Sequence, residues 1–147
     1  MLIGREQIAG MIPHAGAMQL LDGVLSWDET RIRCFSRTHR DLRNPLRCGR
    51  ALPALCGIEY AAQAMALHGG LAAHAGRRPR AGYLASLRDV ICSRARIDDL
   101  EGELIVDAEK LMGEAHRVIY GFEVRVGIKG VLRGRAAVVL DADRTET

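Results

Sequence analysis

The fold of this chain is decided by residues 53–71, which read PALCGIEYAAQAMALHGGL. This stretch is almost entirely apolar or small, and its Ala, Leu and Met residues favour an α-helix. It is too short and too interrupted by small and polar residues to span a membrane. It therefore predicts a helix buried inside a soluble protein.

Two polar side chains inside this stretch are candidates for function. Glu59 and Gln63 are spaced i and i+4, which puts them on the same face of a helix. A carboxylate in apolar surroundings must be paired, protonated or functional, because burying an isolated charge is costly. Glu59 also lies in the first turns after Pro53, where free backbone N–H groups can bind an oxyanion.

The remaining segments predict an antiparallel sheet around this helix. A short helix is expected over Gly4–Met11 and a loop over His39–Leu52, and turns are expected at 28–30, 113–114 and 129–130. The alternating, β-branched segments predict strands over Gln19–Trp27, Arg31–Thr38, Ala81–Ile91, Glu103–Leu111, Ala115–Val126 and Val131–Leu140. An extended conformation is an alternative for the mixed segment 93–100. We expect one α+β domain over residues 1–147, with a polar tail over 140–147.

Composition and charge exclude several classes of protein. The net charge of +3 comes from scattered arginines, which give a mildly basic surface or attract an acidic partner. The few aromatic residues do not interleave with a basic stripe, so nucleic acid is not an expected partner. The four cysteines have no CxxC spacing, so no zinc or redox motif is expected. No signal peptide is recognisable, and we expect reduced thiols in the cytoplasm.

Two segments resemble the β-hydroxyacyl-acyl carrier protein dehydratases of the hotdog fold. Ile12-Pro13-His14, followed by Met18–Leu25, is similar to the N-terminal pattern of that family. Pro53 with Glu59 and Gln63 resembles the opening of the family's central helix, in which Glu comes six residues after Pro and Gln four later. The sequence of residues 57–63, GIEYAAQ, is most similar to that of a subgroup associated with aryl polyene biosynthesis clusters.

The sequence departs from this family where the catalytic histidine is expected. The family carries that histidine in a Gly-His-Phe-Pro-Gly stretch just upstream of the helix. Here the corresponding place is taken by Asn44–Leu52, NPLRCGRAL, which is shorter and contains no histidine. The family's catalytic histidine therefore has no matching position in this chain.

The resemblance implies a dehydratase site with three roles. Glu59 would be the acid that protonates the leaving hydroxyl. The alternative role for Glu59 is structural, as a buried carboxylate bonded to backbone. Helix-opening amides near Ala54 and Leu55 would bind the thioester oxygen, with Gln63 assigned to substrate binding.

A histidine is the usual base in this chemistry, and two candidates are available in the sequence. His39 ends a strand just before the altered loop, and His14 matches a family histidine that is not the catalytic one. We prefer His39 over His14, and we expect the base to reach within about 6 to 7 Å of Glu59, so that both groups touch one substrate. The alternatives are a solvated loop position for His39 and a structural role for His14.

The resemblance implies dehydration of 3-hydroxyacyl thioesters carried on an acyl carrier protein, in fatty-acid or aryl-polyene-type synthesis. No metal or redox cofactor is expected, because the substrate arrives on the phosphopantetheine of the carrier. We expect a homodimer or a heterodimer with another hotdog subunit, and Glu59 in a narrow apolar tunnel near that interface. The alternatives are a non-catalytic hotdog subunit that completes the site of an active partner, and an acyl thioesterase.

Overall fold

The computed structural model describes residues 2–12, 16–72 and 82–140. His14, the loop over 77–80 and the tail residues 141–147 lie outside the described residues. The elements are β1 (Ile3–Gly4), α1 (Arg5–Ala9), β2 (Gly23–Trp27), β3 (Arg31–Ser36), α2 (Gly57–Ala72), β4 (Gly82–Cys92), β5 (Leu104–Gly113), β6 (Arg117–Val126) and β7 (Lys129–Leu140). Short 3₁₀ helices are η1 (Gly16–Met18), η2 (Thr38–Arg40) and η3 (Ala54–Cys56).

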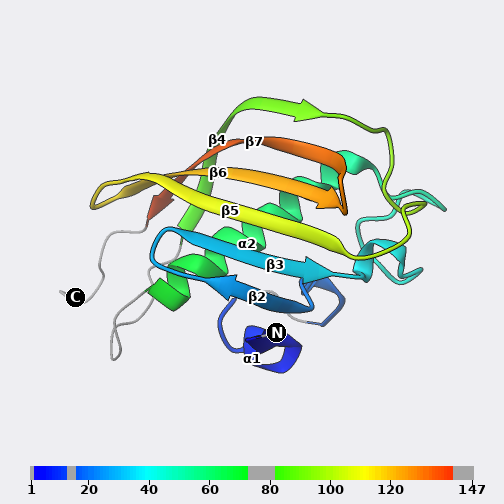
Figure 1. Cartoon of the computed structure of the whole chain (residues 1–147), viewed down its shortest axis with the longest axis horizontal. Coiled ribbons are helices and arrows are strands. Elements are labelled where there is room, and N and C mark those ends of the chain that lie inside the picture. The colour runs from blue at the N-terminus through cyan, green and yellow to red at the C-terminus, as the bar shows by residue number, and fades with distance from the viewer. Residues whose placement is uncertain (1, 13–15, 73–81, 141–147) are drawn as a thin grey trace.

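All seven strands form one sheet in the order β1-β2-β3-β5-β6-β7-β4, and every pairing is antiparallel. The sheet lies against one side of α2 (Figure 1). This arrangement confirms the predicted α+β fold. Because β4 pairs with β7 alone among the described strands, it forms one edge of the sheet.

The core lies between α2 and the sheet. Buried side chains of α2, including Tyr60 and Leu67, belong to one cluster with Leu104 of β5, Val124 of β6 and Leu132 of β7. Gly57 brings the start of α2 close to β7, because a Cβ at this position would lie 2.8 Å from Leu132 Cδ2. A larger residue at position 57 would therefore push the N-terminus of α2 away from the sheet.

The other face of α2 is open to solvent. Leu55, Glu59, Ala66 and Gly69 are exposed, and their spacing puts them along one side of the helix. The predicted buried helix is therefore buried on one face alone in this single chain. None of the helices that the structure describes is long and apolar enough to cross a bilayer.

Several predicted boundaries differ from the structure. The predicted turn at 129–130 is wrong, because Lys129 pairs with Val126 and both Lys129 and Gly130 belong to β7. The turn lies at Gly127 and Ile128, where Gly127 has a φ of 58°. A glycine with positive φ at the first central position is typical of a type II′ hairpin turn. The segment 93–100, considered as a possible strand, makes a single bridge through Arg96.

Candidate active site at the start of the central helix

The N-terminus of the central helix is anchored by the segment over 95–98. Ala54 N–H donates to the carbonyl of Ala95 at 3.0 Å, and Ile97 N–H donates to the carbonyl of Leu52 at 3.0 Å. Leu52 N–H donates to the carboxylate of Asp98 at 2.8 Å. A hydrogen bond from Arg96 holds the pKa of Asp98 well below its usual range, so this anchor is ionised at neutral pH.

These bonds decide which helix-opening amides are free. The N–H of Ala54 is taken by Ala95, so it is not available to a substrate oxygen in this conformation. Leu55 is the second residue of η3, and it is 56% exposed. Of the two residues predicted to bind the thioester oxygen, Leu55 is the one whose position faces solvent.

The side chain of Glu59 is exposed in this single chain and makes no hydrogen bond or ion pair with any residue that the structure describes. The expected tunnel around it is not formed by one chain, since the sheet covers the opposite face of α2. Glu59 has neither the partners nor the burial of a structural carboxylate. Its carboxylate is accessible on the open face of α2, where a second subunit or a substrate could contact it.

Gln63 lies one turn further along α2 and points into the protein. Its Oε1 accepts a hydrogen bond from Leu20 N–H at 2.9 Å, and its Nε2 donates to the carbonyl of Met18 at 2.7 Å. The side chain is completely buried. In the single chain, the amide of Gln63 therefore connects α2 to the segment that precedes β2.

His39 is completely buried, and it is not the solvated loop residue of the alternative interpretation. Its Nε2 is 2.9 Å from the carbonyl of Leu100, to which it donates in the neutral tautomer that carries the proton on Nε2. Its Nδ1 has no hydrogen-bond partner among the described residues. No hydrogen bond joins His39 to Glu59 in the part of the chain that the structure covers.

The other described histidines have different surroundings. His68 is buried in α2, with Nδ1 2.7 Å from the hydroxyl of Tyr120 and Nε2 2.9 Å from the carbonyl of Asp28. It ties the helix to β6 and to the β2–β3 turn. His116 is exposed at the β5–β6 hairpin. Within residues 2–12, 16–72 and 82–140, no imidazole is bonded to Glu59.

Protonation of the buried histidines predicts a loss of stability in mild acid. Burial lowers the pKa of both His39 and His68 below the usual value of 6.5, although their backbone acceptors oppose this in part. The unfolded chain therefore binds more protons than the folded chain as the pH falls below about 6.5, so the free energy of unfolding decreases there.

Urea unfolding between pH 7.5 and 5.5 measures this effect. We expect the unfolding midpoint to fall steadily over this range, and the fall to be smaller in His39→Asn. Asp98, whose pKa is lowered, loses its contribution at a much lower pH and is not involved. A midpoint that is constant over this range would contradict the prediction.

A buried chain of hydrogen bonds fixes the loop that replaces the family's histidine segment. Asn44 Nδ2 donates to the Tyr60 hydroxyl at 2.9 Å and to the carbonyl of Thr38 at 2.9 Å. The Tyr60 hydroxyl is 2.7 Å from Thr38 Oγ1, which donates to the carbonyl of Leu20 at 2.9 Å. The sequence analysis missed this network, although a tyrosine in an apolar helix indicates that its hydroxyl needs a partner.

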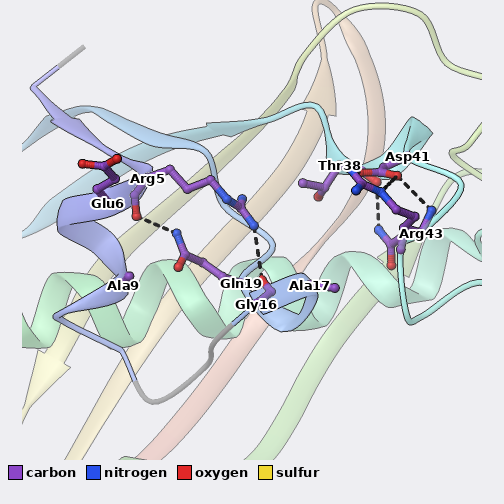
Figure 2. Close-up of a pocket in the computed structure, with 10 residues that line it drawn as sticks. Arg5, Glu6, Ala9, Gly16, Ala17, Gln19, Thr38, Asp41 and Arg43 are labelled. Atoms are coloured by element: carbon purple, nitrogen blue, oxygen red, sulfur yellow. Dashed lines mark hydrogen bonds and ion pairs between the residues drawn. The ribbon is translucent and has the colours of Figure 1, made fainter.

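A hollow of about 650 Å³ lies between α1, η1 and the loop after β3 (Figure 2). Its two arginines are bonded within the chain: Arg5 bonds to Asp22 and to the carbonyl of Gly16, and Arg43 bonds to Asp41. Glu59 does not line it. This hollow is therefore not part of the candidate site.

One antiparallel sheet lying against a single long central helix is the architecture of the hotdog fold. A family model described as ApeP-like, ApeP dehydratase, matches residues 6–146, so the chain belongs to the ApeP-like dehydratase family. This confirms the predicted dehydratase family and the predicted class of enzyme. A comparison with curated protein sequences finds no match.

Solved structures share this fold. The dehydratase heterocomplex ApeI:P from Xenorhabdus doucetiae is 21% identical over 95% of this chain and 93% of that chain, with a TM-score of 0.81. The thioesterase HI1161 from Haemophilus influenzae is 12% identical over 99% of both chains, with a TM-score of 0.68. The conserved protein PA5202 from Pseudomonas aeruginosa is 21% identical over 89% and 96%, with a TM-score of 0.64.

Proposed function

We propose that this chain acts as one subunit of a hotdog pair that dehydrates 3-hydroxyacyl thioesters carried on an acyl carrier protein. Membership of the ApeP-like dehydratase family supports the reaction type. The observation that carries the assignment of the site is the free carboxylate of Glu59 on the open face of α2. A second subunit placed on this face would bury Glu59 between α2 and the second subunit.

In the proposed reaction, a base removes the proton from the carbon next to the thioester carbonyl. Glu59 donates a proton to the 3-hydroxyl, so that the C–O bond breaks, water leaves and a C=C bond forms. An N–H group at the start of the helix, near Leu55, stabilises the charge that develops on the thioester oxygen. The chain needs no metal or redox cofactor for these steps.

The base is proposed to come from the other subunit. The loop over 44–52 has no histidine, and His39 is bonded to Leu100 and not to Glu59. A composite site, with the acid from this chain and an imidazole from its partner, supplies both groups. The sheet edge at β4 offers the place for such a partner, and the ApeI:P structure from X. doucetiae is itself a heterocomplex.

The carrier protein and the compartment are also part of the proposal. Carrier proteins are acidic, and a net charge of +3 favours their approach to this chain. Cys34, Cys48, Cys56 and Cys92 are all free thiols, which fits a reducing cytoplasm. Between fatty-acid-type and aryl-polyene-type substrates, membership of the ApeP-like family favours the aryl-polyene type.

Mass spectrometry of a 3-hydroxyacyl carrier substrate tests the proposal. The chain is assayed alone and together with a hotdog subunit that carries the Gly-His-Phe-Pro-Gly segment. We expect loss of water when both subunits are present and little loss with either alone. Loss of water by this chain alone would contradict the composite site. Release of the free acid would indicate a thioesterase.

A further inference from the structure

The open edge of the sheet is apolar and exposed. Along β4, residues 82–89 are all exposed, and no strand among the described residues pairs with its outer side. Four large apolar side chains on this strand are between 39% and 56% exposed: Tyr83, Leu84, Leu87 and Ile91. An exposed sheet edge with this apolar composition is a surface for another strand.

Arginines gather beside this edge, on the outer face of the sheet, which is the face turned away from α2. Leu132 packs against Gly57 of α2, so the alternation of side chains along β7 puts Arg133 and Arg135 on the outer face. Arg88 of β4 is directly opposite Arg135 in the register, so it shares that face. All three arginines are exposed.

These guanidinium groups have no ion pair with any described residue. Arg133 is opposite Glu123 of β6, but the carboxylate of Glu123 is 3.7 Å from Arg125 instead. Arg88 and Arg135 are directly opposite each other, and like charges in that arrangement destabilise a sheet. The acidic residue next to Arg88 is Asp89, which lies in a β-bulge with a φ of 55°. The outer face beside the edge therefore carries an excess of positive charge.

Pairing with an identical strand would double this charge. If β4 of two copies paired antiparallel about Leu87, the middle residue of the strand, Arg88 would be opposite Ser86 of the other copy. The two Arg88 residues would then be diagonal neighbours about 7 to 8 Å apart on one face. Each would also have its own Arg135 beside it. Four guanidinium groups would line up across the new interface.

We propose that β4 selects its partner by charge: it favours a second hotdog subunit whose edge strand carries carboxylates on the outer face, and it disfavours an identical copy. The inference rests on the proposed function in so far as that function requires a second hotdog subunit. The apolar residues of β4 supply affinity for any hotdog edge, and the Arg88–Arg135 pair decides which edge is accepted.

The chain itself provides the probe for a test. In the variant Arg88→Glu/Arg135→Glu, the same edge carries carboxylates in place of guanidinium groups. Equal amounts of wild type and variant are mixed, and native mass spectrometry separates the three dimers by mass. We expect the mixed dimer in about tenfold excess over its random share at low salt. The excess should shrink as salt screens the charges.

The control is Arg40→Glu/Arg117→Glu, which changes two exposed arginines away from the Arg88–Arg135 pair by the same total charge. Its mixture with wild type should give random shares. Random shares for the β4 variant, or no dimer in any mixture, would overturn the proposal. Wild-type self-association by ultracentrifugation gives an independent measurement, which does not depend on the variant folding. Wild-type self-association should strengthen with added salt, because salt screens the repulsion between the arginines. Weaker self-association at high salt would overturn the proposal.

These outcomes are separate from the test of the proposed function. Charge selection can fail while the paired subunits still remove water from the substrate. Conversely, the mixed dimer of wild type and variant can form although no dehydration is detected with any hotdog partner. The two measurements therefore report on the pairing rule and on the reaction independently.

Discussion

Replacing Glu59 with Gln is expected to slow dehydration by the paired subunits by about 10²- to 10⁴-fold, the usual contribution of a general acid. Glutamine keeps the size and the hydrogen-bonding oxygen of the side chain, but it cannot give a proton to the leaving hydroxyl. Single-turnover measurements on a 3-hydroxyacyl carrier substrate isolate this step. They avoid a contribution from product release.

Stability should be unaffected by this change, because the side chain of Glu59 is exposed and bonds to no described residue of its own chain. The matched control is Glu101→Gln, which removes a charge from another exposed position. That variant should retain full turnover. If Glu59→Gln also retains full turnover, Glu59 is not the acid, and the assignment of the site to the open face of α2 would have to be abandoned.

The substitution Gln63→Ala is expected to have the largest effect on stability. It leaves the Leu20 N–H and the Met18 carbonyl without their partner, at a cost of about 2 to 5 kcal/mol for the two groups. For a domain of this size, this corresponds to a fall in Tm of about 5 to 15 °C. Thermal unfolding followed by circular dichroism measures the change.

The control for this prediction is Gln7→Ala. Gln7 accepts a hydrogen bond from Gly4 N–H at 2.9 Å, but in an exposed position, so its loss should shift Tm by only a few degrees. Kinetics of Gln63→Ala then decide the second role predicted for this residue. An unchanged Tm with a raised KM would show that Gln63 binds substrate and does not stabilise the fold.

The fold could be predicted from sequence because the compositions of two parts of the chain agree with it. Residues 53–71 have the composition of one long apolar helix, and the segments after residue 103 have the β-branched residues of long strands. The boundaries were harder to predict. The predicted turn at 129–130 lies two residues after the observed turn at 127–128, because Lys129-Gly130 and Gly127-Ile128 both resemble hairpin turns. The pairing of whole strands, and not the local sequence, selects between them.

The candidate site was predicted in part. Spacing and resemblance were enough to select Glu59, but whether it is buried depends on a surface that one chain does not contain. The sequence could not show that the amide of Ala54 is taken by Ala95, because these residues are distant along the chain. His39 was selected for its place at a strand end, and its bond to Leu100 depends on a loop whose path local patterns do not encode.

The exposed edge at β4 also has a consequence for the cell that makes this protein. Until it is paired, a newly folded chain presents Leu84, Leu87 and Ile91 to the crowded interior, where they can recruit other strands. If the proposed second subunit covers this edge, synthesis of the two chains has to be matched, and surplus chain becomes a substrate for chaperones and proteases. The same feature predicts a practical outcome: expression without a partner should give a lower soluble yield than co-expression with one.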